Sequence, residues 1–134
     1  MDIDIVFLVS SKHPIIDQKK LSIHTLSEYP WAVVDEHHSN TLYDYIFTQQ
    51  GMEDNPVKVK TNSLTLLQSL VARSYFITML PQHMVQEDIN RGDICVLEID
   101  NFNLRRKGGL IYRDVRLGNP EAETLMETIR ELCA

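Results

Sequence analysis

The chain alternates short apolar runs with longer amphipathic stretches over nearly all of its 134 residues. The short runs are rich in Ile, Val and Leu and are bounded by Pro, Asn, Ser or Gly, which is typical of β-strands. The stretches between them carry apolar residues at the spacing of one helical face. Because a helix between two strands returns the chain to the same edge of a sheet, this alternation predicts an α/β domain with a largely parallel sheet flanked by helices.

The clearest expected strand covers residues 3–9, where Ile3 and Ile5 share one face and Val6 and Leu8 share the other. The expected strands are residues 3–9, 31–34, 57–60, 76–80, 94–99 and 110–112. Pro30 limits any helix before the second strand to about one turn, because proline disfavours a helical residue before it and has no N–H to donate.

The expected helices begin at residues that cap a helix, and several end at glycine. The first carries Leu42, Tyr45, Ile46 and Gln49 at helical spacing and stops at Gly51. The expected caps are Ser39 or Asn40, residues 61–63 and Asn119, and the later helices cover residues 64–71, residues 82–90 with Pro81 as first helical residue and Gly92 near the end, and residues from Pro120 onward.

The charge balance argues against nucleic-acid binding by this chain. It has 13 Lys and Arg against 19 Asp and Glu, a formal net charge of -6. Most of the affinity of a protein for nucleic acid comes from positive charge that contacts phosphate. The one dense basic run, Arg105-Arg106-Lys107, precedes Gly108-Gly109 and is predicted to be a solvated turn, with a phosphate-binding patch as the less favoured alternative. If the protein acts on DNA, another segment must contact the DNA.

Cysteine usage and hydropathy indicate a cytoplasmic protein. Cys95 and Cys133 lie far apart in sequence and form no disulfide framework, so a reducing compartment is expected. No apolar stretch reaches the ~18 residues of a membrane span. No Gly-x-Ser-x-Gly turn and no glycine-rich phosphate loop is present. We therefore expect no membrane contact, no catalytic residue and no cofactor.

His37-His38, preceded by Asp35-Glu36, is the one pattern that suggests a metal. Neighbouring side chains of a strand point to opposite sides, and no further His or Cys stands at ligand spacing. A surface cluster on a loop is therefore favoured, and no metal is predicted. A small α/β enzyme that uses these histidines and nearby carboxylates remains the less favoured alternative.

Lys60-Thr61-Asn62-Ser63 is the candidate binding site. It follows an expected strand and precedes an expected helix, and ligands of open α/β sheets bind beyond the carboxyl ends of strands, where helix N-termini present N–H groups. The alternative from the pattern alone is that one residue caps the helix and the others are solvated.

An ordered set of residues resembles the effector-binding domain of LysR-type transcription regulators. The set is His13-Pro14, Leu26 with Pro30-Trp31, residues 61–71 running on to Met79-Leu80-Pro81, residues 109–113, and Pro120-Glu121-Ala122 before a helix ending Ile129-Arg130-Glu131. The resemblance implies a periplasmic-binding-protein-like fold of type 2, with an effector held in the cleft between two α/β lobes. It implies that the regulator is a cytoplasmic homo-oligomer that senses a small molecule, expected to be anionic.

By the same resemblance, residues 7–98 form the second lobe, and residues 108–134 return to the first lobe as a strand and a helix. The opening of the first lobe and the DNA-binding helix-turn-helix domain are expected to lie outside this chain, which we interpret as a partial domain. DNA contact is then expected only through that other domain. The rival from the same architecture is a fragment of a solute-binding receptor.

The resemblance also assigns site residues. The effector contacts of this lobe fall on Thr61, Asn62 and Ser63, with Lys60 beside them, whereas Trp31 is expected to pack. Between Ala72 and Ile77 the family usually has two glycines separated by one residue, where this chain has Ser74-Tyr75-Phe76. Either the turn takes another geometry here, or Phe76 fills space that is open in relatives, and in the second case Phe76 is predicted to contact the effector.

Overall fold

The computed structural model of the chain describes residues 1–35, 42–49, 51, 55–100, 102–109 and 119–133. The strands are β1 (Asp2–Ser10), β2 (Trp31–Val34), β3 (Val57–Thr61), β4 (Thr78–Pro81), β5 (Ile94–Leu97) and β6 (Leu104–Lys107). The helices are α1 (Ile23–Ser27), α2 (Leu42–Gln49), α3 (Leu64–Arg73), α4 (Gln86–Arg91) and α5 (Pro120–Cys133), with 3-10 turns η1 (Pro14–Asp17) and η2 (Gln82–Val85). The expected α/β class is confirmed, and the expected strand at residues 110–112 lies outside the described residues.

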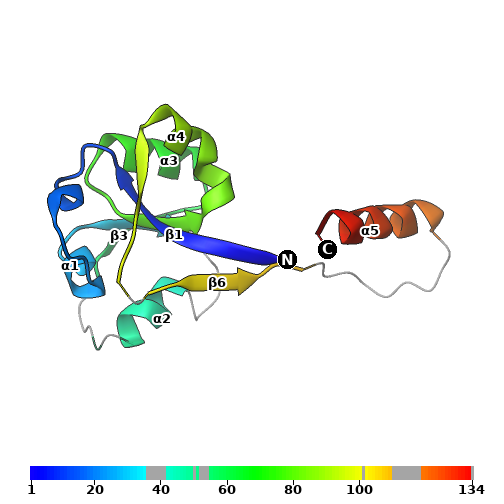
Figure 1. Ribbon diagram of the computed structural model, residues 1–134, viewed down its shortest axis with the longest axis horizontal. Helices are drawn as coiled ribbons and strands as arrows, with labels where there is room; N and C mark the ends of the chain where they lie inside the picture. The colour runs from blue at the N-terminus through cyan, green and yellow to red at the C-terminus, as the bar shows by residue number, and fades with distance from the viewer. Residues whose placement is uncertain (36–41, 50, 52–54, 101, 110–118, 134) are drawn as a thin grey trace.

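The sheet departs from the expectation at β1. β2 and β3 pair in parallel, and a parallel bridge between Trp31 and Ile77 joins β2 to the residue just before β4. β1 pairs antiparallel with β4 on one edge and with β5 on the other. β2, β3, β4 and β5 therefore run in one direction, as predicted, and β1 lies among them in the opposite direction (Figure 1).

The basic run is a strand, so the prediction of a solvated turn at Arg105-Arg106-Lys107 was wrong. These residues form most of β6, which pairs antiparallel with the first half of β1. Asp2 stands opposite Lys107 and Asp4 opposite Arg105, whose Nε lies 2.9 Å from the Asp4 carboxylate. Opposite charges across two strands stabilise the pairing. Gly108 and Gly109, which favoured the prediction of a turn, come directly after Lys107, the last residue of the strand.

Pro81 was predicted to open a helix, but it is the last residue of β4 and stands opposite Ile5 of β1. Its backbone is extended, at φ -55° and ψ 128°, and a proline without an N–H suits the end of a strand. The expected single helix over residues 82–90 is divided into η2 and α4. α4 ends as predicted, because Gly92 adopts a left-handed conformation at φ 81°.

Capping follows the sequence where the cap is described. The Asn119 side chain accepts hydrogen bonds from the N–H groups of Glu121 and Ala122, and Pro120 is the first residue of α5. Of the three candidates before α3, Ser63 is the N-cap, because its hydroxyl accepts the Leu66 N–H at 3.2 Å. Ser39 and Asn40 lie outside the described residues.

Two hydrophobic clusters lie on the two faces of the sheet. Trp31 is fully buried in the cluster under α1 and α2, where its ring meets Phe7 and Phe47 edge to face. Its indole N–H donates to the Leu26 carbonyl at 2.9 Å, so Trp31 packs as expected. Leu67 of α3 belongs to the second cluster. Successive residues of β1 enter opposite clusters, as the pleat of a strand requires.

We predict that Leu67→Ala lowers the free energy of unfolding by about 2 to 5 kcal/mol, because the side chain is fully buried and its removal leaves a cavity. Leu66→Ala is the matched control. Leu66 is the neighbouring leucine of the same helix and is 52% exposed, so its truncation is expected to change stability by less than about 0.5 kcal/mol. Urea denaturation of both variants measures the difference, and equal costs would contradict the assignment of the buried face.

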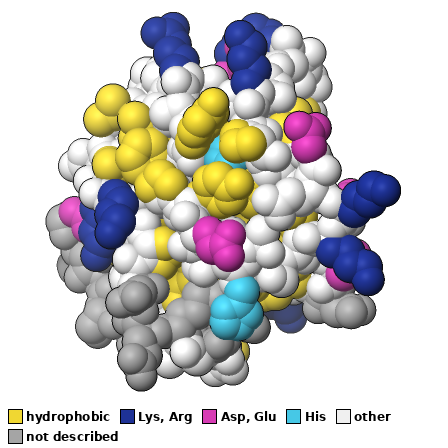
Figure 2. All heavy atoms as spheres, turned by 90° about the vertical axis from the view of Figure 1, so that its left-hand side faces the viewer, with side chains coloured by type: hydrophobic (Ala, Val, Ile, Leu, Met, Phe, Trp, Pro, Cys, Tyr) yellow, Lys and Arg dark blue, Asp and Glu magenta, His cyan; other side chains and the backbone are white. Residues whose placement is uncertain are grey.

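His13 ties η1 to the turn between α3 and β4. It is buried, its Nδ1 accepts the Ile15 N–H at 3.1 Å, and its Nε2 lies 3.0 Å from the Tyr75 carbonyl oxygen. Together these contacts require a neutral ring with the proton on Nε2. Figure 2 shows hydrophobic side chains gathered on the side of the molecule that carries η1 and α1. Burial lowers the pKa of His13 below its usual value of 6.5, against the opposing effect of the hydrogen bond to Tyr75.

We therefore expect the free energy of unfolding to decrease as the pH falls below about 6.5, because the unfolded chain then binds a proton that the folded chain does not. One group contributes at most about 1.4 kcal/mol per pH unit. In His13→Asn, whose amide oxygen can accept the Ile15 N–H but does not titrate, urea denaturation between pH 7 and pH 5 is expected to show a flatter dependence. His24→Asn, at an exposed position, is the control and should keep the wild-type slope.

None of the residues of α5 is buried, and none belongs to either of the two hydrophobic clusters. Figure 1 shows it standing apart from the sheet and the other helices. Leu125 is 60% exposed and Leu132 is 80% exposed. Leu125 and Leu132 are seven residues apart, so they lie on the same face of this helix, and that apolar face is open to solvent.

We predict that the chain self-associates as its concentration rises, because exposed apolar stripes tend to be covered by a partner. Multi-angle light scattering should give a mass that increases with concentration. The double variant Leu125→Glu, Leu132→Glu should remain at the mass of one chain. Constant monomer mass for the wild-type chain at high concentration would contradict this prediction.

Candidate functional site

The predicted site lies at one edge of the sheet, where β2, β3 and β4 have their carboxyl ends. Val34, the last residue of β2, stands beside Thr61, the last residue of β3, and the Asp35 N–H donates to the Thr61 carbonyl at 2.9 Å. α3 begins directly after this point, so its N-terminus also faces this edge. The strand, turn and helix predicted for Lys60 to Ser63 are all present.

Two side chains of this turn accept hydrogen bonds from backbone N–H groups of the turn and of α3. The Thr61 hydroxyl accepts the Ser63 N–H at 3.1 Å, and the Ser63 hydroxyl caps α3. A hydroxyl that accepts a hydrogen bond still has its own proton to donate. Asn62 and Ser63 are exposed and Thr61 is half-buried. The turn therefore presents hydroxyl and amide donors to solvent while it also fixes the start of the helix.

Lys60 adds a positive charge next to this turn. Its Nζ lies 5.4 Å from the centroid of the Tyr43 ring. A hydrogen bond to the Tyr43 side chain is the largest effect that raises the pKa of Lys60, and the charges of Asp44 and Asp35 raise it further. Lys60 is therefore a cation at neutral pH, and Tyr43 of α2 holds it at the edge of the sheet.

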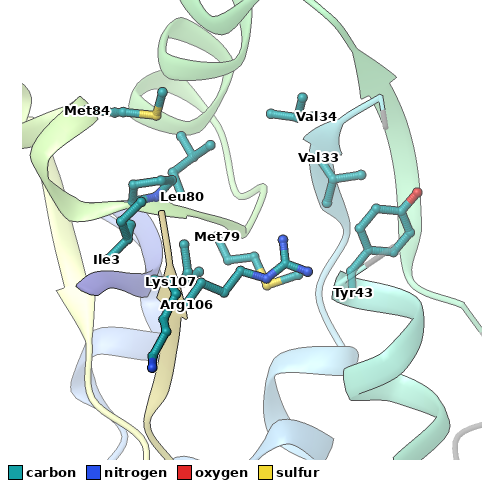
Figure 3. A pocket seen from close by; sticks show the side chains of 11 residues that line it. Ile3, Val33, Val34, Tyr43, Met79, Leu80, Met84, Arg106 and Lys107 are labelled. Carbon is teal, nitrogen blue, oxygen red and sulfur yellow. The ribbon is translucent and has the colours of Figure 1, made fainter. Parts of the chain in front are cut away.

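A pocket of ≈ 360 Å³ lies at this edge of the sheet (Figure 3), and its lining includes Val34, the strand partner of Thr61, but none of the residues Lys60 to Ser63. Its wall is mostly apolar and comes from β1, β2, β4 and η2, with Ile3, Ile5, Val33, Val34, Met79 and Met84 among its side chains. Tyr43 closes one side, so the same ring borders both the pocket and Lys60. Arg106 of β6 extends across the pocket toward Tyr43, whereas the Lys107 side chain points away from it.

Phe76 is not brought to this site. Ile77, the next residue, bridges to Trp31 at the start of β2, so Phe76 lies at the amino end of β4. Its ring packs partly buried against the cluster that contains Leu67 and Val71. The four residues Lys60 to Ser63 share one edge of the sheet, and Phe76 lies near the other.

The sequence did not point to Tyr43 or Arg106. The helix around residues 42–49 was assigned the face of Tyr45, but Tyr45 is 60% exposed, and the buried side chains are Tyr43, Ile46 and Phe47. Their spacing of three and four residues is a helical face and could have identified Tyr43. Arg106 was not selected as a site residue because residues 105–107 were predicted to form a solvated turn.

Nothing described supports the metal-dependent alternative. In the part of the chain that the structure covers, no three His, Cys, Asp or Glu side chains come close enough to hold a metal ion. His37, His38 and Glu36 lie outside that part. Among the described helices, none has the length and apolar character needed to cross a membrane.

The whole chain, residues 1–134, matches the family described as LysR substrate binding domain. The chain therefore belongs to the LysR substrate-binding domain family. A probable nitrogen assimilation transcriptional activator of Synechococcus elongatus is 25% identical over 129 residues, which are 96% of this chain and 41% of that protein. The chain spans less than half the length of the curated relatives it matches, which are named as transcriptional regulators.

Solved structures have the same fold. The regulatory domain of CcmR from Synechocystis PCC6803, in complex with 2-PG, is 18% identical, with a TM-score of 0.71 over 96% of this chain and 64% of that chain. The effector-binding domain of QuiR, in complex with shikimate, is 17% identical, with a TM-score of 0.62 over 78% of this chain and 49% of that chain. The expected periplasmic-binding-protein-like fold of type 2 is confirmed.

Proposed function

We propose that this chain is the effector-sensing part of a LysR-type transcription regulator and that it binds a small anionic molecule at the carboxyl edge of its sheet. The observation that carries the proposal is the turn at Thr61 to Ser63, of which Asn62 and Ser63 are exposed, with the cation Lys60 next to it and a pocket at the same edge that is lined by Val34, the strand partner of Thr61. Ligands of open α/β sheets bind at such an edge. CcmR and QuiR, which share the fold, were solved with small molecules bound.

The proposed mechanism is a shift between an open and a closed arrangement of two lobes. Residues 7–98 form the second lobe, and residues 108–134 return to the first. An effector that binds the closed cleft more tightly than the open one favours closure, and closure changes how the subunits of a homo-oligomer present their DNA-binding domains. DNA is contacted only by those domains, in the cytoplasm.

The chemistry of the turn supports an anionic effector. Hydroxyl donors, an ammonium group and the N-terminal end of the α3 dipole all favour negative charge. No catalytic residue and no cofactor belong to the proposal, because the site has donors and a cation but no paired nucleophile and base among its described residues. The solute-binding receptor is the weaker alternative, since the relatives of this chain are named as transcriptional regulators.

We predict that Thr61→Ala in the full-length regulator weakens effector binding by roughly ten- to a hundredfold, the effect of losing a hydrogen bond to a charged group, about 1.5 to 3 kcal/mol. The effector is first found by thermal-shift screening of small carboxylates and phosphates, and its affinity is then measured by calorimetry. The loss of the hydroxyl that accepts the Ser63 N–H should cost folding only about 0.5 to 2 kcal/mol.

Leu67→Ala is the matched control for this experiment, because it lowers stability without touching the turn. It should leave the effector affinity of the folded regulator unchanged. If Thr61→Ala loses stability but keeps the wild-type affinity, Thr61 serves only to fix the start of α3, and the proposed contact is wrong.

A further inference from the structure

The pocket at this edge of the sheet, bounded by β1, β2, α2, β4, η2 and β6, combines an apolar wall with two basic residues, Arg106 and Lys107, of which Arg106 extends across the pocket (Figure 3). Ile3, Ile5, Val33 and Met79 present hydrocarbon or thioether surface to it. No Asp or Glu of the described chain lines it. Its volume of ≈ 360 Å³ lies within the range of roughly 300 to 1,000 Å³ that is usual for small-molecule sites.

The pleat of β6 decides which of the three basic residues faces this pocket. Arg106 stands opposite Ile3, and Arg105 stands opposite Asp4. Because successive side chains of a strand point to opposite faces, Arg106 joins Ile3 on the pocket face. Arg105 lies on the other face, where Asp4 neutralises it at 2.9 Å. Figure 3 shows the Arg106 side chain lying across the pocket with its guanidinium toward Tyr43.

Arg106 also differs from Arg105 in forming no ion pair with any carboxylate of the described residues. A guanidinium presents a planar set of donors that fits a carboxylate or sulfonate through two parallel hydrogen bonds. Such bonds are stronger beside an apolar wall, where less water competes, than in open solvent.

We propose that this pocket binds an organic anion with an apolar body, such as an aromatic or branched aliphatic acid. The acid group binds the guanidinium of Arg106, and the body lies against the side chains of β1, β2 and β4. The inference rests on the proposed function for the location of the ligand, and it adds the ligand class and the residue that selects it. It excludes a small inorganic anion as the preferred ligand, because that would leave the apolar wall unused.

The test compares two fluorescent probes that differ mainly in charge. 8-Anilinonaphthalene-1-sulfonate is an anion with an apolar body, and N-phenyl-1-naphthylamine is its uncharged counterpart. We expect Arg106→Met to weaken binding of the sulfonate by roughly ten- to a hundredfold, as for loss of a hydrogen-bonded charge partner, and to change binding of the uncharged probe less than about twofold. Arg106→Lys, which keeps the charge, should recover part of the affinity for the sulfonate.

Arg105→Gln is the matched control. It removes the same charge from the neighbouring position of β6 but on the opposite face, and Arg105 and Arg106 are both exposed residues. Affinity for the sulfonate should stay within about twofold of the wild-type value. If Arg105→Gln weakens the sulfonate as much as Arg106→Met does, net charge rather than a placed guanidinium determines binding, and the inference is overturned.

The same titration, followed by NMR with labelled methionine methyl groups, shows where the sulfonate probe binds. Met79 and Met84 line the pocket, and Met126 lies on α5. We expect the NMR signals of Met79 and Met84 to shift with the sulfonate, and that of Met126 to stay in place. Shifts confined to Met126 would place the probe on α5 and overturn the inference. Binding of the probes is measured without DNA. A negative result in these titrations therefore counts against the ligand class inferred here. A full-length regulator whose DNA binding responds to no effector would instead count against the proposed function.

Discussion

The antiparallel strand β1 is the element on which the rest of the structure depends. One of its edges pairs with β4, and its other edge pairs first with β6 and then with β5. Its two faces supply side chains to both hydrophobic clusters, Phe7 and Val9 to one and Leu8 to the other. Residues 7–10 are all buried. A change in the register of this one strand would move every one of these contacts to the wrong face.

The direction of β1 also creates the candidate site. Because β1 runs against β4, its amino end lies beside the carboxyl end of β4, and Ile5 stands opposite Pro81. The early residues Ile3 and Ile5 therefore wall the edge where a parallel sheet places its ligand sites. β6 pairs with this same amino end, which brings Arg106 to the pocket from about a hundred residues away in sequence. The apolar wall and the cation are both consequences of one reversed strand.

The sequence predicted what depends on local chemistry. Periodicity located the buried strands at residues 3–9 and 31–34, and hydroxyl and amide side chains marked the starts of α3 and α5. It did not predict the direction of β1, the strand at β6 or the place of Phe76. Strand pairing is decided by contacts between residues far apart in the chain, and the polar segment Leu104–Lys107 is a strand through its pairing with Asp2 to Ile5 of β1, about a hundred residues away. The polar turn was visible in the sequence, whereas the pocket at the same edge required the assembled sheet.

The two cations of this edge are held in different ways, and this bears on how an acidic chain can select an anion. The net charge of -6 belongs to the whole chain, but charges are screened beyond a Debye length of about 10 Å at 0.1 M salt. The position of a charge relative to the site therefore matters more than the net charge of the chain.

Lys60 already interacts with the Tyr43 side chain and with the charges of Asp44 and Asp35, so its positive charge is partly balanced by its neighbours. Within the described part of the chain, Arg106 forms no ion pair with a carboxylate, and its side chain lies across an apolar wall. Because Tyr43 borders both the pocket and Lys60, a ligand that moves this ring on entering the pocket would also change the contact between the ring and Lys60.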